Sequence, residues 1–239
     1  MKEQLYTVPV NDAFDKGLEC PVCAMYDKLE KDAVSFMMGP SYMEDDIRME
    51  TNEKGFCGKH LTMLLSEKNR LGLSLILKTH LDEQIYEAKT FAGKKIKPKS
   101  LLKKNENTAF SEWAYARVNQ CYICDRINLV YPHYIGTVFY LYKKEPEFRE
   151  KFEQCKGFCQ KHAADLIEKA RTELSGEMLQ GFYEKVIALY TDNLKRVADD
   201  LDWFANKFDY RYKDEPWKNA KDSIERAALK TNGIVTEEK

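Results

Sequence analysis

The sequence lacks any long apolar segment, and this argues against a membrane-spanning helix. Its longest apolar stretches, LILK and YIGTVFYLY, are far shorter than the roughly 20 residues needed to cross a bilayer. The first residues, MKEQLYTVPVNDAFD, contain no apolar core of a secretory signal. We therefore expect a cytoplasmic protein with no membrane partner, in which cysteine thiols stay reduced.

An excess of charge of either sign is also missing. The 239 residues include 38 lysines and arginines and 39 aspartates and glutamates, so the formal net charge is -1. Such a chain has no overall field that would draw it onto nucleic acid or anionic lipid. Residues 94–104 are rich in lysine, but such a run is usually a solvated linker. We expect no nucleic acid partner.

Motifs of several common enzyme classes are absent. The sequence has no G-x-x-x-x-G-K-[ST] for phosphate binding, no G-x-S-x-G for acyl transfer and no H-E-x-x-H for metalloprotease chemistry. These absences favour a non-enzymatic protein.

Cysteine and histidine follow a repeated pattern. A C-x-x-C motif occurs at 20–23 and at 121–124, and a C-x-x-H motif follows a Gly-Phe pair at 57–60 and at 159–162. Corresponding residues are separated by 101 or 102 positions. We interpret this as an internal duplication, in which each copy is one helical module.

Three cysteines and one histidine per copy are a ligand set typical of structural zinc. A cysteine and a histidine three residues apart at a helix start lie on the same face, and Gly55 and Gly157 are expected to make the preceding tight turn. The helix N-terminus favours thiolate over thiol. We predict two zinc ions per chain, with the ligands Cys20, Cys23, Cys57, His60, Cys121, Cys124, Cys159 and His162.

The pattern leaves two questions open. The same ligands could hold iron–sulfur clusters, because cluster iron is bound by cysteine and occasionally by histidine. The two motifs of each copy are separated by 33 or 34 residues, which is enough for a helix out and back, so we favour pairing within each copy over crossed pairing. The seventh cysteine, Cys155, has no counterpart in the first copy and is expected to be a bystander.

Apolar residues at helical spacing predict an all-α fold. We expect a helix from 20 to the Gly39-Pro40 stop, a long helical run from 57 to 91 bent near Gly72, and a helix from 121 to 144 with a kink or restart at Pro132. Further helices are expected at 146–154, 159–174, 177–208 and 217–233, and a short extended piece at LYTVPV. The predicted architecture is two tandem helical repeats, each with a Cys3His metal site, plus a C-terminal helix: residues 1–97, 98–213 and 214–239.

The ECPVC opening, the repeated GFCxKH elements and the length of 239 residues resemble a family of uncharacterised proteins from Clostridia-type bacteria, known as a domain of unknown function. The resemblance covers nearly the whole chain and implies no activity. It implies a bacterial, cytoplasmic setting, and an anaerobic host would favour the iron–sulfur alternative.

Function is therefore predicted from the metal sites. The favoured hypothesis is a zinc-binding helical protein whose structural sites support a scaffold for an unknown protein or small-molecule partner. The first alternative is an iron–sulfur or thiol-based redox protein. The second is a zinc-dependent enzyme with an open site, in which His60 or His162 acts as a base and water is the fourth ligand.

Overall fold

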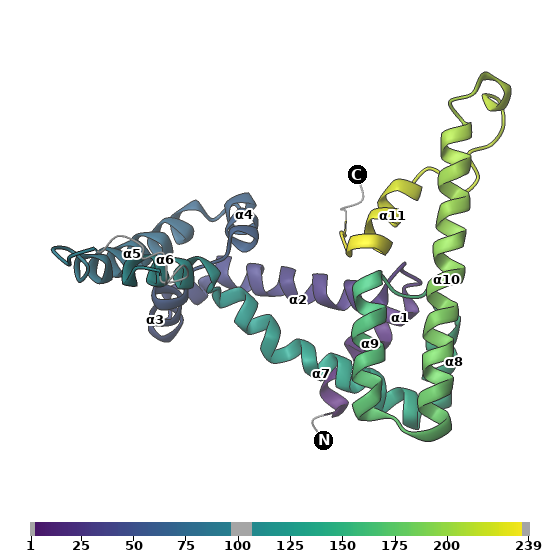
Figure 1. The fold of residues 1–239 in the computed structure, drawn as a ribbon, viewed down its shortest axis with the longest axis horizontal. Coiled ribbons are helices and arrows are strands. Elements are labelled where there is room, and N and C mark those ends of the chain that lie inside the picture. The colour runs from purple at the N-terminus through teal and green to yellow at the C-terminus, as the bar shows by residue number, and fades with distance from the viewer. Residues whose placement is uncertain (1–2, 97–106, 236–239) are drawn as a thin grey trace, which may run out of the picture. The chain divides into compact units, whose positions relative to one another are not determined.

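The computed structural model describes residues 3–96 and 107–235, and within them it is helical and has no strand (Figure 1). The all-α prediction is confirmed. The α-helices are α1 Thr7–Asp15, α2 Pro21–Met38, α3 Asp45–Lys54, α4 Gly58–Ser66, α5 Arg70–Lys89, α6 Ala109–Asn119, α7 Tyr122–Lys144, α8 Pro146–Gln154, α9 Gln160–Glu173, α10 Gly176–Asn206 and α11 Ser223–Asn232. Short 3-10 helices span Glu3–Tyr6, Pro40–Met43 and Tyr210–Tyr212.

The chain divides into two compact units. Unit 1 combines Met1–Lys28 with Val130–Lys239, and unit 2 is Leu29–Leu129. These units are not the stretches 1–97 and 98–213 that the tandem arrangement predicts, because α2 begins in unit 1 and ends in unit 2, whereas α7 begins in unit 2 and ends in unit 1. The predicted boundary between 97 and 98 lies outside the described residues, and the one after 213 falls inside unit 1.

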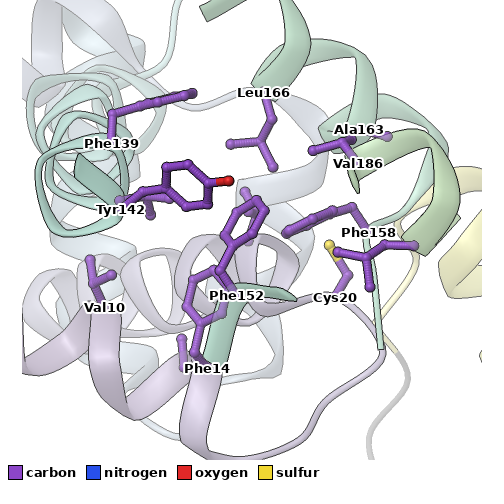
Figure 2. Close-up of a cluster of buried hydrophobic side chains, with 14 of the residues drawn as sticks. Val10, Phe14, Cys20, Phe139, Tyr142, Phe152, Phe158, Ala163, Leu166 and Val186 are labelled. Atoms are coloured by element: carbon purple, nitrogen blue, oxygen red, sulfur yellow. The ribbon is translucent and has the colours of Figure 1, made fainter. Parts of the chain in front are cut away.

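Unit 1 has a core rich in aromatic rings. Phe152 is fully buried, and its ring centroid lies 5.1 Å from that of Tyr142 and 5.2 Å from those of Phe158 and Phe182. Cys20 belongs to the same buried cluster and is drawn together with Phe152 and Phe158 in Figure 2. Helices α9 and α10 lie side by side, and α11 packs against both (Figure 1).

Unit 2 has a smaller aliphatic core, and polar contacts supplement it. Its buried apolar residues include Val34, Met37, Leu64 and Ile76. Helix α3 packs against α5. Between α5 and α6, the Glu87 carboxylate accepts hydrogen bonds from Trp113 and Arg117, at 2.7 Å from Trp113 Nε1 and 2.9 Å from Arg117 Nε.

Two local predictions are wrong. LYTVPV is not extended but forms the first 3-10 helix and the start of α1, because Pro9 falls in the first turn of α1, where its missing N–H costs nothing. The run from 57 to 91 breaks before Gly72, where the Asn69 side chain accepts a hydrogen bond from Gly72 N at 2.9 Å and caps α5. At Pro132, where the sequence predicts a kink or a restart, α7 continues without a restart.

Packing on both sides of Pro132 explains the continuity of α7. A proline inside a helix costs roughly 3 kcal/mol through a lost hydrogen bond and a clash. Ile127 and Val138, before and after the proline, are both buried, and burying an aliphatic side chain contributes about 1.5–3 kcal/mol. The stop of α2 before Gly39, α8 at Pro146–Gln154 and the end of α11 at Gly233 agree with the sequence, although α11 begins six residues later than expected.

Candidate metal centres

Four ligand-type side chains meet in unit 1 at the starts of two helices. Cys20 directly precedes α2 and Cys23 lies in its first turn, whereas Cys159 directly precedes α9 and His162 lies in its first turn. The backbone N–H of Cys23 donates to the Cys20 sulfur at 3.4 Å, because the first N–H groups of a helix have no partner within it. We call this group centre 1.

The donor atoms of centre 1 converge on one point. His162 Nδ1 lies 3.3 Å from the sulfurs of Cys23 and Cys159 and 3.6 Å from that of Cys20. The sulfurs of Cys23 and Cys159 are 3.5 Å apart. All four atoms lie within 4.8 Å of one another, and all four residues are buried.

The second group lies in unit 2 and has the same construction. Cys57 precedes α4, His60 lies in its first turn, and Cys121 and Cys124 are at the start of α7. His60 Nδ1 lies 3.2 Å from the Cys121 sulfur and 3.3 Å from the sulfurs of Cys57 and Cys124. The sulfurs of Cys57 and Cys124 are 3.9 Å apart. We call this group centre 2.

The structure therefore brings together all eight predicted ligands, but the favoured pairing is wrong. Each centre combines the C-x-x-C of one copy with the C-x-x-H of the other. The loop length permitted pairing within a copy, yet the 18-residue α2 carries the chain into unit 2 before Cys57. The 23-residue α7 likewise carries it into unit 1 before Cys159.

Both groups fit a single tetrahedral ion. Zinc bonds of roughly 2.3 Å to sulfur and about 2.0 Å to nitrogen give tetrahedral edges of about 3.8 Å between sulfurs and about 3.5 Å between sulfur and nitrogen. The sulfur pairs above lie 3.5 and 3.9 Å apart, and the sulfur to nitrogen distances are 3.2 to 3.6 Å. The donor set and its spacing are those of a closed Cys3His site.

The electrostatics of both groups favour a thiolate, the form that binds metal. Hydrogen bonds from Cys20 and Cys23 hold the pKa of the Cys159 thiol well below its usual range, whereas burial raises the pKa of Cys20 to about 12. In centre 2 burial disfavours the thiolate of Cys121 and the imidazolium of His60. The hydrogen bond between the two side chains nevertheless lowers the pKa of Cys121 to about 6. The same contact and Glu30 raise the pKa of His60 to about 10.

Glu30 is a site residue that sequence reasoning missed. It is buried on α2, its Oε1 atom accepts the Nε2–H of His60 at 2.9 Å, and Lys59 Nζ donates to the same carboxylate at 2.6 and 2.7 Å. Such a carboxylate fixes which ring nitrogen of a histidine faces the metal. Burial opposes ionisation of Glu30, but the bonds from His60 and Lys59 outweigh it and lower its pKa.

The corresponding position beside centre 1 holds a different chemical group. Tyr131 follows Glu30 by 101 positions, the same offset as between the C-x-x-C motifs. Its ring centroid lies 6.3 Å from that of His162. Its hydroxyl is buried and has no hydrogen-bond partner among the described residues. The equal offset was thus present in the sequence, but a glutamate and a tyrosine at matching positions do not indicate a shared role beside the metal ligands.

Cys155, His80 and His133 lie outside both centres. Cys155 is half-buried, and burial raises its pKa to about 11. His80 Nδ1 donates to the Asn52 carbonyl oxygen at 2.7 Å, and the His133 ring stacks on Tyr6 at 5.5 Å between centroids.

Among the residues that the structure describes, no helix has the length and apolar character required to cross a membrane. Comparison with curated proteins gives no match. Comparison with solved structures gives none either. The model of a family described as "Family of unknown function (DUF6062)" matches residues 1–238. Because this match spans nearly the whole sequence, the chain belongs to that family.

Proposed function

We propose that the protein is a zinc-binding helical scaffold in which two structural ions organise the starts of four helices. The observation that carries this proposal is the convergence of three sulfurs and one imidazole nitrogen within 4.8 Å in each unit. Three thiolates and a neutral imidazole are a preferred ligand set for structural zinc, and thiolates select against magnesium and calcium.

The spacing supports a single ion over a cluster in each centre. An iron–sulfur cluster distributes its ligands over several iron atoms, so ligands on different irons lie farther apart than the edge of one tetrahedron. In each centre all four donor atoms lie within 4.8 Å of one another. This favours zinc over the redox alternative.

The donor set also favours a structural role over catalysis. A catalytic zinc site has three protein ligands and leaves the fourth position to water or substrate, whereas each centre here supplies four. His60 contacts thiols through Nδ1 and Glu30 through Nε2, which leaves neither nitrogen to act as a base.

Each ion would act as a cross-link between distant parts of the chain. Cys23 and Cys159 are 136 residues apart, and His60 and Cys121 are 61 residues apart. Joining such segments removes many conformations from the unfolded chain. Free thiols at all seven cysteines are consistent with a cytoplasmic protein.

The partner of this scaffold would be a protein or small molecule that contacts unit 2. An apolar pocket of about 380 Å³ there is lined by residues that include Phe56, Leu61, Leu77 and Val118. Val118 is 71% exposed. Exposed apolar surface of this kind is typical of binding sites.

The test is elemental analysis with a visible spectrum, on protein purified anaerobically without chelator. We expect two zinc ions per chain and no visible absorption. Cys57→Ser and Cys159→Ser should each lose one ion, whereas the matched control Cys155→Ser should retain both. Absence of any transition metal would refute the proposal, and iron with a visible absorption band would establish the redox alternative.

A further inference from the structure

The two centres differ in how far their ligands are shielded from solvent. In centre 1 the exposed fractions are 1% for Cys20, 4% for Cys23, 0% for Cys159 and 7% for His162. In centre 2 His60 and Cys121 are buried, but Cys57 and Cys124 are partly exposed. Two groups with the same ligand set therefore present different surfaces to solvent.

The end of α11 accounts for part of this shielding. Gly233 follows α11 and has the left-handed conformation, with φ of 68°, that closes a helix end. A β-carbon built on Gly233 would lie 3.7 Å from the sulfurs of both Cys23 and Cys159. The turn that ends α11 therefore lies directly against centre 1.

Lys230 holds this turn in place. Its side chain is 1% exposed, and its ammonium donates to the carbonyl oxygens of Glu19, at 2.6 Å, and of Lys156. Glu19 immediately precedes Cys20, and Lys156 immediately precedes the Gly-Phe pair before Cys159. One ammonium thus binds the two segments that deliver the ligands of centre 1.

The charge of Lys230 also suits this position. Burying a lysine is costly unless its charge is compensated. Its Nζ lies 3.3 Å from Glu19 Oε2, which Arg196 also contacts at 2.5 Å. Zinc with three thiolates and one imidazole has a net charge of -1, so a nearby ammonium favours the loaded centre.

Among the described residues, centre 2 has no buried lysine beside it. In residues 3–96 and 107–235 the buried lysines are Lys207 and Lys230, and both belong to unit 1. Lys207 donates to three carbonyl oxygens of residues 212–215. The lysine beside centre 2 is Lys59, whose side chain is 62% exposed and which pairs with Glu30.

We infer that α11 completes the metal centre of unit 1, with Lys230 as its positioning residue, so that the ion of centre 1 is locked and that of centre 2 is exchangeable. This rests on the proposed function, because it concerns the release of ions that the centres bind. A chelator or a competing thiol must reach the ion or its thiolates. Gly233 and Lys230 prevent that approach at centre 1, and the partly exposed Cys57 and Cys124 permit it at centre 2.

The test measures zinc release into excess chelator, followed with a chromogenic zinc indicator. The full chain should release its two ions in two phases whose rates differ on the order of 10-fold or more. Cys159→Ser, which leaves centre 2, should show the fast phase, and Cys57→Ser should show the slow phase. Equal rates, or slower release from centre 2, would overturn the inference.

Lys230→Met tests the positioning role, with the exposed Lys221→Met as matched control. We expect Lys230→Met to accelerate the slow phase by about 10-fold and to leave the fast phase of the same molecule unchanged. If this variant fails to fold, Arg226→Ala loosens α11 by removing its ion pair with Asp200 of α10, at 2.8 Å, without touching the centre. A slow phase unaltered in the folded variants would contradict the role of α11.

Two outcomes separate a failure of the proposed function from a failure of the inference about α11. If the unaltered chain bound no zinc, the proposed function would fail before any comparison of rates. If it bound two ions that left at the same rate, the proposed function would stand and the inference about α11 would fail.

Discussion

The Oε1 atom of Glu30 lies 2.9 Å from Nε2 of His60, on the imidazole nitrogen opposite to the one that faces the three thiols of centre 2. The carboxylate accepts the Nε2–H, so Nδ1 is the nitrogen that binds zinc when the ion displaces its proton. Carboxylates in this position typically alter metal affinity by about 10- to 100-fold.

Glu30→Ala should therefore weaken zinc binding at centre 2 by about 10-fold or more. Glu30→Gln retains an acceptor oxygen and should weaken it less. Competition with a chelator of known affinity would measure both variants in a Cys159→Ser background, where centre 2 is the remaining site. Equal affinities for all three proteins would show that the contact does not position His60.

The crossed pairing predicts an unusual pattern for double variants. Cys57→Ser with Cys121→Ser removes two ligands of one centre, so one zinc ion should remain. Cys20→Ser with Cys57→Ser removes one ligand from each centre, so neither should retain zinc tightly. Native mass spectrometry would count the ions, and the reverse pattern would restore pairing within each copy.

Removal of metal should affect unit 2 more than unit 1. Structural zinc contributes on the order of 10 kcal/mol in small modules, but the aromatic core around Phe152 gives unit 1 stability of its own. We expect chelation to lower the melting temperature without complete unfolding. Hydrogen exchange should increase first near 55–62 and 157–164, and then through 29–129. Unchanged protection at the helix starts would contradict a structural role for the ions.

Phe152→Ala should lower the free energy of unfolding by about 3–5 kcal/mol, because it opens a cavity among the rings of unit 1. The control is Phe208→Ala, since Phe208 is 77% exposed. Chemical denaturation would measure both variants. A loss below 1 kcal/mol for Phe152→Ala, an order-of-magnitude limit for surface positions, would mean that the cluster is loosely packed.

Gly157→Ala should destabilise unit 1 and weaken zinc binding at centre 1. Gly157 has φ of 74°, and a β-carbon there would lie 2.6 Å from the backbone oxygen of Leu189, so we expect a cost of about 1–3 kcal/mol. Gly58→Ala is the matched control, because a β-carbon on Gly58 meets nothing within 4 Å. Thermal unfolding and zinc content would be measured for both variants. Equal melting temperatures and equal zinc content for Gly157→Ala and Gly58→Ala would refute the steric argument.

The metal ligands and most helices could be predicted from the sequence because their signals are local. Helical spacing, a glycine before each C-x-x-H and a proline after α2 depend on neighbouring residues. The prediction of an extended LYTVPV is wrong because the sequence alone does not show whether a proline lies in the first turn of a helix, where it is tolerated, or in a segment that is not helical. The break before α5 lies at Asn69 and not at Gly72, because the Asn69 side chain caps the helix through a hydrogen bond from Gly72 N.

The pairing of ligands and the residues around them could not be predicted in the same way. Which C-x-x-C meets which C-x-x-H depends on where α2 and α7 carry the chain, and loop length alone does not determine this. Lys230 lies 68 positions after His162, in a helix outside the repeated pattern. No local signal connects it with centre 1.

The exchange of motifs between the two copies has a consequence for assembly. A polypeptide with a single copy would carry one C-x-x-C and one C-x-x-H, and it could reproduce the crossed arrangement only by associating with a second molecule. Its metal loading would then depend on dilution. Covalent linkage replaces that encounter by an intramolecular one, with an effective concentration on the order of millimolar. The apparent affinity of each centre for its ion should consequently not depend on protein concentration.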